Sequence, residues 1–316
     1  MAIKKKSKLK KERFFKRIID WLIWKAFRLL VFIVQRSSLK TINVFGKKLG
    51  DFAFIFPNPR KNIILNNLRM AYGDEKDKKE QKDICRSCFQ NFGRNVLEAI
   101  RYPYLTFDEI DNLINIDGKE VLDNALKKGK GVIALSAHLG NFAIIAAKLI
   151  PYGYKFTVIF RNPENTNIGK EWLILMKKMG LNPIFDKPRH VCVKKSLELL
   201  KKNGILFLQI DQNTKISRGV YAKFFKHELP TFTGPVVMAM RTGAIILPLF
   251  IVRDENNHHR IIIDNPFELL LTGERGLDIK SNIERLSAIT ESYIRKFPEQ
   301  WWWIHRRWKN AKKIVR

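Results

Sequence analysis

Short apolar runs alternate with stretches of helical spacing through the second half of the chain, and this alternation limits the possible fold more than any other feature. Five runs are typical of strands, several of them too uniformly apolar to leave one face in water: residues 132–135, 156–160, 205–210, 245–252 and 260–263. Helical patterns separate them at 141–150, 164–179, 191–202 and 233–241. The alternation predicts an α/β fold with a mainly parallel central sheet flanked by helices.

The first of these strands leads into Ser136-Ala137-His138-Leu139-Gly140-Asn141-Phe142-Ala143, where a glycine turn precedes a predicted helix. An imidazole held there is a candidate general base, and the alternative is a histidine satisfied by backbone groups at a strand end. A histidine becomes a strong base only when a second group, usually a carboxylate, fixes its tautomer and balances its charge. Ala143 occupies the nearest position that could fold back from the first helical turn. The sequence therefore predicts a site of the right shape around His138 with an incomplete base.

Two other candidate residues follow predicted strands. Ligands of parallel sheets bind beyond the carboxyl ends of the strands, which is where His138, Arg161 and Asp211 all fall. Arg161 precedes Asn162-Pro163 and is available to a phosphate or an oxyanion; the alternative is a surface arginine with no role. Asp211 is a candidate for organising the site, or else a turn or cap residue. Thr233 and Gly234 come at a predicted helix start, where a hydroxyl and backbone N–H groups can cradle an anion.

Blocks of sequence spread over roughly residues 45 to 310 carry a resemblance to a known family. They are Asn67-Leu68-Arg69-Met70-Ala71-Tyr72, Cys88-Phe89-Gln90-Asn91-Phe92-Gly93-Arg94, Phe160-Arg161-Asn162-Pro163, Asp211-Gln212, Thr233-Gly234-Pro235 and Pro298-Glu299-Gln300-Trp301-Trp302-Trp303-Ile304-His305-Arg306-Arg307. In this order they resemble the bacterial lipid A late acyltransferases, of lauroyl and myristoyl type, within the lysophospholipid acyltransferase superfamily. The signature of that family is a His followed five positions later by Asp or Glu.

The resemblance implies a fold similar to that of glycerol-phosphate acyltransferases, with His138 and Asp211 in the catalytic site. It implies that Arg161 and Asn162 bind the polar part of the acceptor, and we add Asn141, Thr233 and Gly234 as substrate-binding candidates.

Ala143 departs from the signature and has two interpretations. It is either a Glu→Ala substitution made to slow turnover, which we favour, or the mark of a natural relative that relies on His138 alone or has lost activity. Restoring Glu at this position is expected to raise acyl transfer by orders of magnitude.

The 316-residue chain has a net charge of +29, which implies an anionic partner. Nucleic acid, anionic lipid and an acidic protein all qualify on charge alone. Three cysteines argue against a disulfide framework, and we expect Cys85 and Cys88 to pack in the core. Because the sequence holds no P-loop, dinucleotide glycine pattern or H-E-x-x-H, we expect no cofactor and no metal.

The first seventeen residues hold nine Lys or Arg, and an apolar stretch at 18–34 follows with Asp20, Lys25 and Arg28 in one sector of a helical wheel. This pattern favours a helix lying in a membrane interface over a spanning one, although spanning stays open. We therefore divide the chain into a basic leader with a membrane-anchor helix (1–45) and an acyltransferase domain (46–316). The alternative is a solvated tail before an ordinary amphipathic core helix.

The function expected from these features is a membrane-bound acyltransferase at the cytoplasmic face of the inner membrane. It moves a fatty acyl chain from an acyl thioester to a hydroxyl of a lipid A precursor, an anionic glycolipid. Acyl carrier protein is the expected donor and acyl-CoA the lesser one. The alternatives are acylation of another phosphoglycolipid or lyso-lipid and, in another class, a basic nucleic-acid-binding protein. We expect no nucleic-acid partner.

Overall fold

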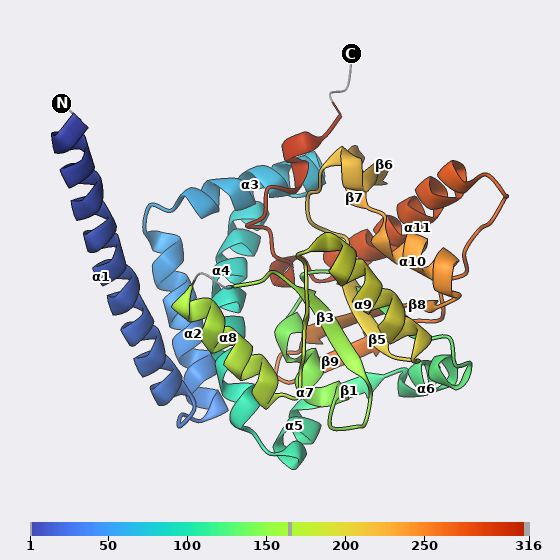
Figure 1. The fold of residues 1–316 in the computed structure, drawn as a ribbon, viewed down its shortest axis with the longest axis horizontal. Helices are drawn as coiled ribbons and strands as arrows, with labels where there is room; N and C mark the ends of the chain where they lie inside the picture. Colours follow the sequence, from blue (N-terminus) through green and yellow to red (C-terminus); the bar gives the residue numbers. More distant parts are fainter. Residues whose placement is uncertain (1, 164–165, 313–316) are drawn as a thin grey trace.

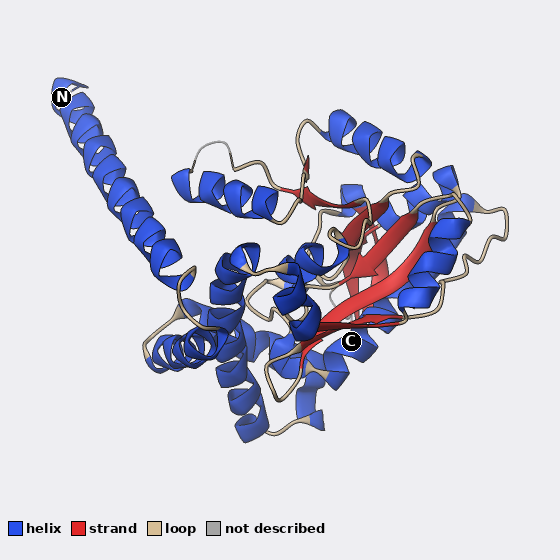
Figure 2. Ribbon diagram, turned by 90° about the horizontal axis from the view of Figure 1, so that it is seen from below, coloured by secondary structure: helices blue, strands red, loops and turns tan. Residues whose placement is uncertain are grey.

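A computed structural model of the chain describes residues 2–163 and 166–312, with side chains from residue 17 onward (Figure 1). Four helices form the N-terminal part: α1 (Ala2–Val34), α2 (Leu39–Ile55), α3 (Pro59–Tyr72) and α4 (Lys78–Arg101). The rest of the chain is an α/β unit, and Figure 2 shows its strands with helices on both sides. Its elements are α5 (Phe107–Leu113), β1 (Ile114–Asp117), α6 (Lys119–Lys127), β2 (Val132–Ser136), α7 (Ile145–Leu149), β3 (Phe156–Phe160), α8 (Asn167–Lys178), β4 (Ile184–Phe185), α9 (Arg189–Lys201), β5 (Ile205–Gln209), β6 (Gly219–Phe224), β7 (His227–Phe232), α10 (Gly234–Thr242), β8 (Ile245–Arg253), β9 (His259–Ile263) and α11 (Arg275–Lys296).

The central sheet has seven strands in the order β1-β9-β8-β2-β5-β3-β4. All neighbouring pairs are parallel except β8 and β9, which are antiparallel. The predicted α/β fold with a mainly parallel sheet is therefore confirmed. Strands β2 and β5 are neighbours, with Ser136 opposite Gln209, so the residues that follow these two strands emerge side by side.

Alternate residues of the central strands supply two apolar cores, as expected for a sheet buried on both faces. Val132 and Ala134 belong to the cluster that holds buried residues of α6 and α7. Ile133 and Leu135 point the other way, into the cluster formed with α9, α10 and α11. The helices thus fix the sheet from both sides and leave the carboxyl ends of β2, β5 and β3 as one edge.

Helix α2 packs against α4 at very short range through glycines of both helices. A Cβ added to Gly46 would lie 2.8 Å from Arg94 Cα, and one added to Gly93 would lie 2.2 Å from the Gly46 carbonyl oxygen. The opposite face of α2 carries apolar side chains that are about half exposed or more: Val44, Phe45, Leu49, Phe52 and Ile55. The division that we expect between residues 45 and 46 falls within this helix.

Helix α1 extends beyond the body in both views, and its C-terminal part packs on α4 and α8 (Figures 1 and 2). Trp24 Nε1 donates to Glu171 Oε1 of α8 at 3.0 Å. The apolar side chains Ile19, Leu22, Leu29 and Ile33 are each about half exposed. Within the described part of the chain, no helix combines the length and apolar character that crossing a membrane requires.

The structure corrects several expectations from the sequence and confirms one. The helix expected at 141–150 begins as a 3₁₀ turn, Phe142–Ile144, before α7. The helix expected from residue 164 begins at Asn167, and residues 164 and 165 lie outside the described residues. Strands β1 and β4 and the β6-β7 hairpin are not predicted, since they are short or polar. Cys85 and Cys88 are buried and unpaired, which confirms core packing.

Candidate active site

The loop after β2 is held in place by contacts that only a glycine permits. Gly140 has φ +57°, and a Cβ there would lie 2.1 Å from the Ile251 carbonyl oxygen. Its backbone N–H donates to the Gln300 carbonyl oxygen at 3.0 Å, and its own carbonyl accepts from Asn95 Nδ2 at 2.8 Å. The loop is therefore clamped between β8, α4 and the C-terminal segment, with His138 at its start.

The Asp211 carboxylate lies directly against His138. Its Oδ1 is 2.9 Å from His138 Nδ1, and its Oδ2 accepts from the His138 backbone N–H at 2.9 Å. Because an ionised carboxylate only accepts hydrogen bonds, the imidazole carries its proton on Nδ1 and presents a lone pair at Nε2. The expectation that this histidine lacks a carboxylate partner is therefore wrong: the acid comes from the end of β5.

Asp211 is held as an anion although it is 2% exposed. Burial acts to raise the pKa of this carboxyl, but the positive charge that His138 carries when it is protonated and the hydrogen bonds from His138 and Trp301 outweigh it, so that the pKa lies below its ordinary value. One of those bonds comes from Trp301 Nε1, which donates to Asp211 Oδ2 at 2.7 Å. A carboxylate fixed by three donors can orient the imidazole and balance its positive charge.

The rest of the imidazole contacts one polar side chain, at Nε2, and two aromatic rings. Gln212 Nε2 lies 2.9 Å from His138 Nε2, where its amide can donate to the lone pair. Trp302 stacks on the imidazole with ring centroids 5.5 Å apart, and Phe142 meets it edge-on at 5.0 Å. Phe92 of α4 stacks on Trp302 at 5.9 Å and is 40% exposed. Packed aromatic rings thus extend from the imidazole to the exposed Phe92.

Ala143 lies in the 3₁₀ turn after the glycine loop and is half-buried. The sequence suggested this position because it could fold back in the first helical turn. The structure shows that an acid 73 positions away in the chain reaches Nδ1 instead. Only the adjacency of β2 and β5 in the sheet identifies His138 and Asp211 as a pair, and local sequence does not show that adjacency.

A buried charge cluster beneath the loop was missed by sequence reasoning. Arg253 of β8 pairs with Glu98 of α4, donating to Oε2 at 2.8 Å and also to Oε1. His259 Nε2 lies 3.1 Å from Glu98 Oε2, and the Asn141 amide donates to the same oxygen at 2.8 Å. Asn95 Oδ1 accepts from Arg253 Nη2 at 2.7 Å. The cluster ties α4 to β8, β9 and the glycine loop.

This cluster fixes the surroundings of His259 and Asn141. His259 follows a polar loop but begins β9 and is 1% exposed. The Asn141 amide also donates to the Asn95 carbonyl oxygen, so both of its hydrogens are used within the protein. Burial lowers the pKa of His259. Burial would raise the pKa of Glu98, but the charges of His259 and Arg253 hold it well below its ordinary range.

The remaining predicted residues lie at the same edge of the sheet without contacting His138 in the described structure. Arg161 follows β3, the neighbour of β5, and is exposed. The Asn162 backbone N–H donates to Asp186 Oδ1 at 3.3 Å. Thr233 and Gly234 begin α10, where Thr233 is half-buried.

The tryptophan-rich C-terminal segment forms the wall behind the site. Trp301 and Trp303 are nearly fully buried, and Arg307 is fully buried. Arg307 Nη1 donates to the Gln212 carbonyl oxygen at 3.1 Å, and Nη2 donates to Thr231 Oγ1 at 2.7 Å. Burial lowers the pKa of Arg307 to about 10. Most of the segment packs in the core, while Trp302 stacks on the imidazole, and this division could not be predicted from the sequence.

The chain matches the bacterial lipid A biosynthesis acyltransferases over residues 5–310, nearly its whole length. The chain belongs to this family. It is an acyltransferase, and the His138–Asp211 pair lies on the edge where such an α/β fold binds its ligands.

Two distant relatives cover nearly the whole chain, and a third covers about half of it. The lipid A biosynthesis palmitoleoyltransferase of Escherichia coli is 23% identical over 291 residues, which is 92% of this chain and 91% of the relative. The lauroyltransferase of the same organism is 22% identical, with 92% of each chain covered. The phosphatidylinositol mannoside acyltransferase of Mycobacterium tuberculosis is 24% identical over 169 residues, 52% of each chain.

Proposed function

We propose that this acyltransferase moves a fatty acyl chain from a thioester to a hydroxyl of a lipid A precursor, with His138 as general base and Asp211 as its orienting acid. The observation that carries the proposal is the contact between the Asp211 carboxylate and His138 Nδ1. It leaves the lone pair of Nε2 on the side that faces Gln212.

The proposed reaction begins when the acceptor hydroxyl takes the place of the Gln212 amide at Nε2. Nε2 removes the hydroxyl proton as the oxygen attacks the thioester carbonyl, and Asp211 balances the imidazolium that forms. The tetrahedral intermediate then collapses to the ester and expels the thiolate. The thiolate takes the proton from Nε2, so the imidazole returns to its starting state.

Ala143 does not remove activity under this proposal, because Asp211 already occupies Nδ1. The opposing hypothesis is that a motif acid at position 143 is indispensable and that this chain is a slowed Glu→Ala variant. The two hypotheses make different predictions for the Ala143→Glu variant.

Substrate binding is proposed for the residues that share the edge with His138. The exposed guanidinium of Arg161 suits bidentate binding of a lipid phosphate, and the Asn162 segment beside it completes the same region. Thr233 and Gly234 are proposed to bind another polar group of the acceptor or donor at the start of α10. The rings of Trp302, Phe142 and Phe92 offer the apolar surface that an acyl chain requires.

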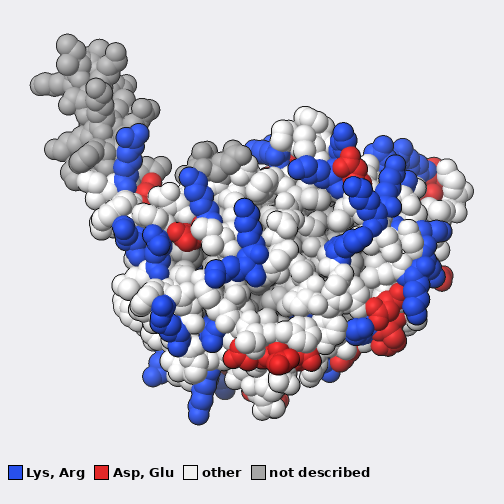
Figure 3. Space-filling model, turned by 60° about the horizontal axis from the view of Figure 1, so that its bottom comes forward, with Lys and Arg blue, Asp and Glu red and all other residues white. Residues whose placement is uncertain are grey.

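Membrane association at the cytoplasmic face of the inner membrane is proposed from the N-terminal helices. The apolar side chains of α1 and the outer face of α2 are exposed, with Leu22 at 53%, Phe52 at 60% and Ile55 at 74%. Burying these side chains in a bilayer interface would be favourable at about 25 cal/mol per Å². The Lys and Arg side chains that Figure 3 shows over one face of the molecule would favour an anionic surface.

The donor is proposed to be acyl carrier protein, an acidic protein suited to a chain of net charge +29, with acyl-CoA as the alternative. The alternative acceptor is another phosphoglycolipid, because one relative is named for acylating phosphatidylinositol mannoside. Both acceptors are anionic glycolipids. A nucleic-acid-binding role would instead require tight RNA or DNA binding that weakens steeply with salt.

Lipid mass spectrometry tests the proposal. Cells with and without the gene are compared, and so are in vitro reactions of the purified chain with an under-acylated lipid A precursor. The expected result is a product heavier by one acyl chain only where the protein is present. Lipid profiles that do not depend on the protein would refute the proposed function.

A further inference from the structure

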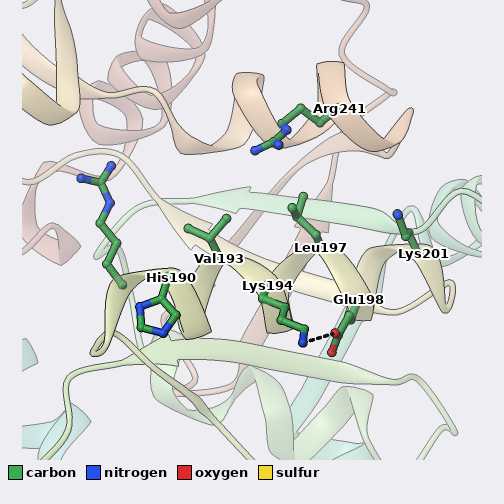
Figure 4. Close-up of a pocket in the computed structure, with 8 residues that line it drawn as sticks. His190, Val193, Lys194, Leu197, Glu198, Lys201 and Arg241 are labelled. Atoms are coloured by element: carbon green, nitrogen blue, oxygen red, sulfur yellow. Dashed lines mark ion pairs between the residues drawn. The ribbon is translucent and has the colours of Figure 1, made fainter.

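A groove of about 730 Å³ lies between α9 and α10, away from His138. Its lining holds four Lys or Arg side chains and one Glu, with two aliphatic side chains between them: Arg189, Lys194, Lys201 and Arg241, then Glu198, then Val193 and Leu197, with His190 at one end. Figure 4 shows Val193 and Leu197 directed toward the helix that carries Arg241. The groove therefore has an apolar floor between basic rims.

The charges of this groove are available to a partner. Arg189, Lys194, Lys201 and Arg241 are exposed, while Val193 and Leu197 are half-buried. The acid among them, Glu198, is 4.0 Å from Lys194 in an ion pair on the same helix. An apolar strip flanked by basic side chains is complementary to an amphipathic helix whose polar face is acidic.

The Arg189 end of the groove lies near the end of β3. The Asp186 backbone N–H donates to the Phe160 carbonyl oxygen at 3.0 Å, and Asp186 Oδ1 accepts from the Asn162 backbone. Arg189 begins α9 three residues after Asp186, so this end lies beside the segment that carries Arg161.

We infer that the α9–α10 groove is the docking surface for an acidic helix of the acyl carrier protein that delivers the acyl thioester. The inference rests on the proposed function, because it concerns the donor of that reaction. A carrier bound here would have its thioester arm at the carboxyl edge of the sheet, toward His138. The basic rims attract the carrier and set its register, while Val193 and Leu197 bury its apolar residues.

Binding of fluorescently labelled holo acyl carrier protein by the full-length chain tests the inference without turnover. The double variant Arg189→Glu/Arg241→Glu reverses one charge on each helix of the groove. The matched control, Lys79→Glu/Lys82→Glu, makes the same change of charge on exposed positions of α4. We expect the dissociation constant to rise at least about tenfold in the groove variant and less than about twofold in the control.

Transfer from acyl-pantetheine, a donor that lacks the carrier protein, separates the inference from the proposed function. The groove variant is expected to keep the wild-type rate with this donor. Equal carrier affinity in the groove variant and the wild type overturns the inference, as does carrier binding too weak to detect in the wild type. Loss of binding to anionic vesicles or to RNA in the groove variant, with its affinity for the carrier unchanged, also overturns the inference. A wild-type chain that transfers from no donor overturns the proposed function instead.

Discussion

Replacing Asp211 by Asn should disable the imidazole while keeping the shape of the site. Two N–H donors, the His138 backbone and Trp301 Nε1, point at the oxygen called Oδ2. An Asn side chain must place its carbonyl oxygen there, because an amide NH₂ would face two donors. Its NH₂ then takes the position of Oδ1 and donates to His138 Nδ1.

This exchange forces the wrong tautomer on the imidazole. With Nδ1 accepting a hydrogen bond, the ring proton moves to Nε2, which can no longer remove a proton from the acceptor hydroxyl. The Gln212 amide can turn its oxygen toward Nε2–H and stabilise this unproductive state. In serine proteases the equivalent Asp→Asn change lowers kcat by about 10⁴, and we expect a loss of that order, about 5 kcal/mol of transition-state stabilisation.

The assay is the initial rate of transfer of a labelled acyl chain to a glycolipid acceptor, at saturating donor. Asp264→Asn is the matched control, since Asp264 follows β9, is half-buried and accepts from Tyr293 Oη at 2.8 Å. The control should keep the wild-type rate, and both variants should keep a cooperative thermal transition. A rate within about tenfold of wild type in Asp211→Asn would refute the orienting role of this carboxylate.

Three further predictions concern the acceptor, the buried charges and the membrane. Arg161→Ala should raise the KM for the acceptor with kcat nearly kept, because a phosphate clamp acts equally before and during reaction; an unchanged acceptor KM would remove Arg161 from binding. Glu98→Gln should lower the free energy of unfolding at pH 7 by about 3 kcal/mol by leaving Arg253 without its anion. The pKa of Glu98 is lower in the folded state than in the unfolded state. The ionised carboxylate therefore stabilises the fold fully above the unfolded-state pKa, and this stabilisation is lost as the pH falls below about 4.3. The difference between wild type and Glu98→Gln in urea unfolding should therefore narrow below that pH, and a constant difference would contradict the argument. Removal of residues 1–35 should release the protein from anionic liposomes in a sedimentation assay, and retention at high salt would assign the anchor elsewhere.

The strand pattern made the sheet predictable, because uniformly apolar runs bounded by helical patterns have few other solutions. It also placed His138, Asp211 and Arg161 at one edge. The partner of the imidazole was not predicted, since no carboxylate lies within one helical turn of His138 in the sequence. The acid of Asp211 reaches Nδ1 only because β2 and β5 are neighbours, and strand order is not visible in local sequence.

Burial of charged residues was the other feature that the sequence could not supply. Glu98 lies in a helix rich in charged positions, and His259 follows a polar loop, so both are typical of solvated residues. They are buried because Arg253 meets them from a different strand. The composition of the tryptophan-rich segment would also suit a membrane surface, and only the packing of Trp301 and Trp303 assigns it to the core.

The most direct test of the account compares acyl transfer by the chain itself with transfer by its Ala143→Glu variant, with His138→Ala in both backgrounds. If Asp211 completes the base, the chain is active, Ala143→Glu changes its rate by less than about tenfold, and His138→Ala abolishes transfer in both. An inert chain that gains activity by orders of magnitude on Ala143→Glu would contradict the account and assign the missing acid to position 143.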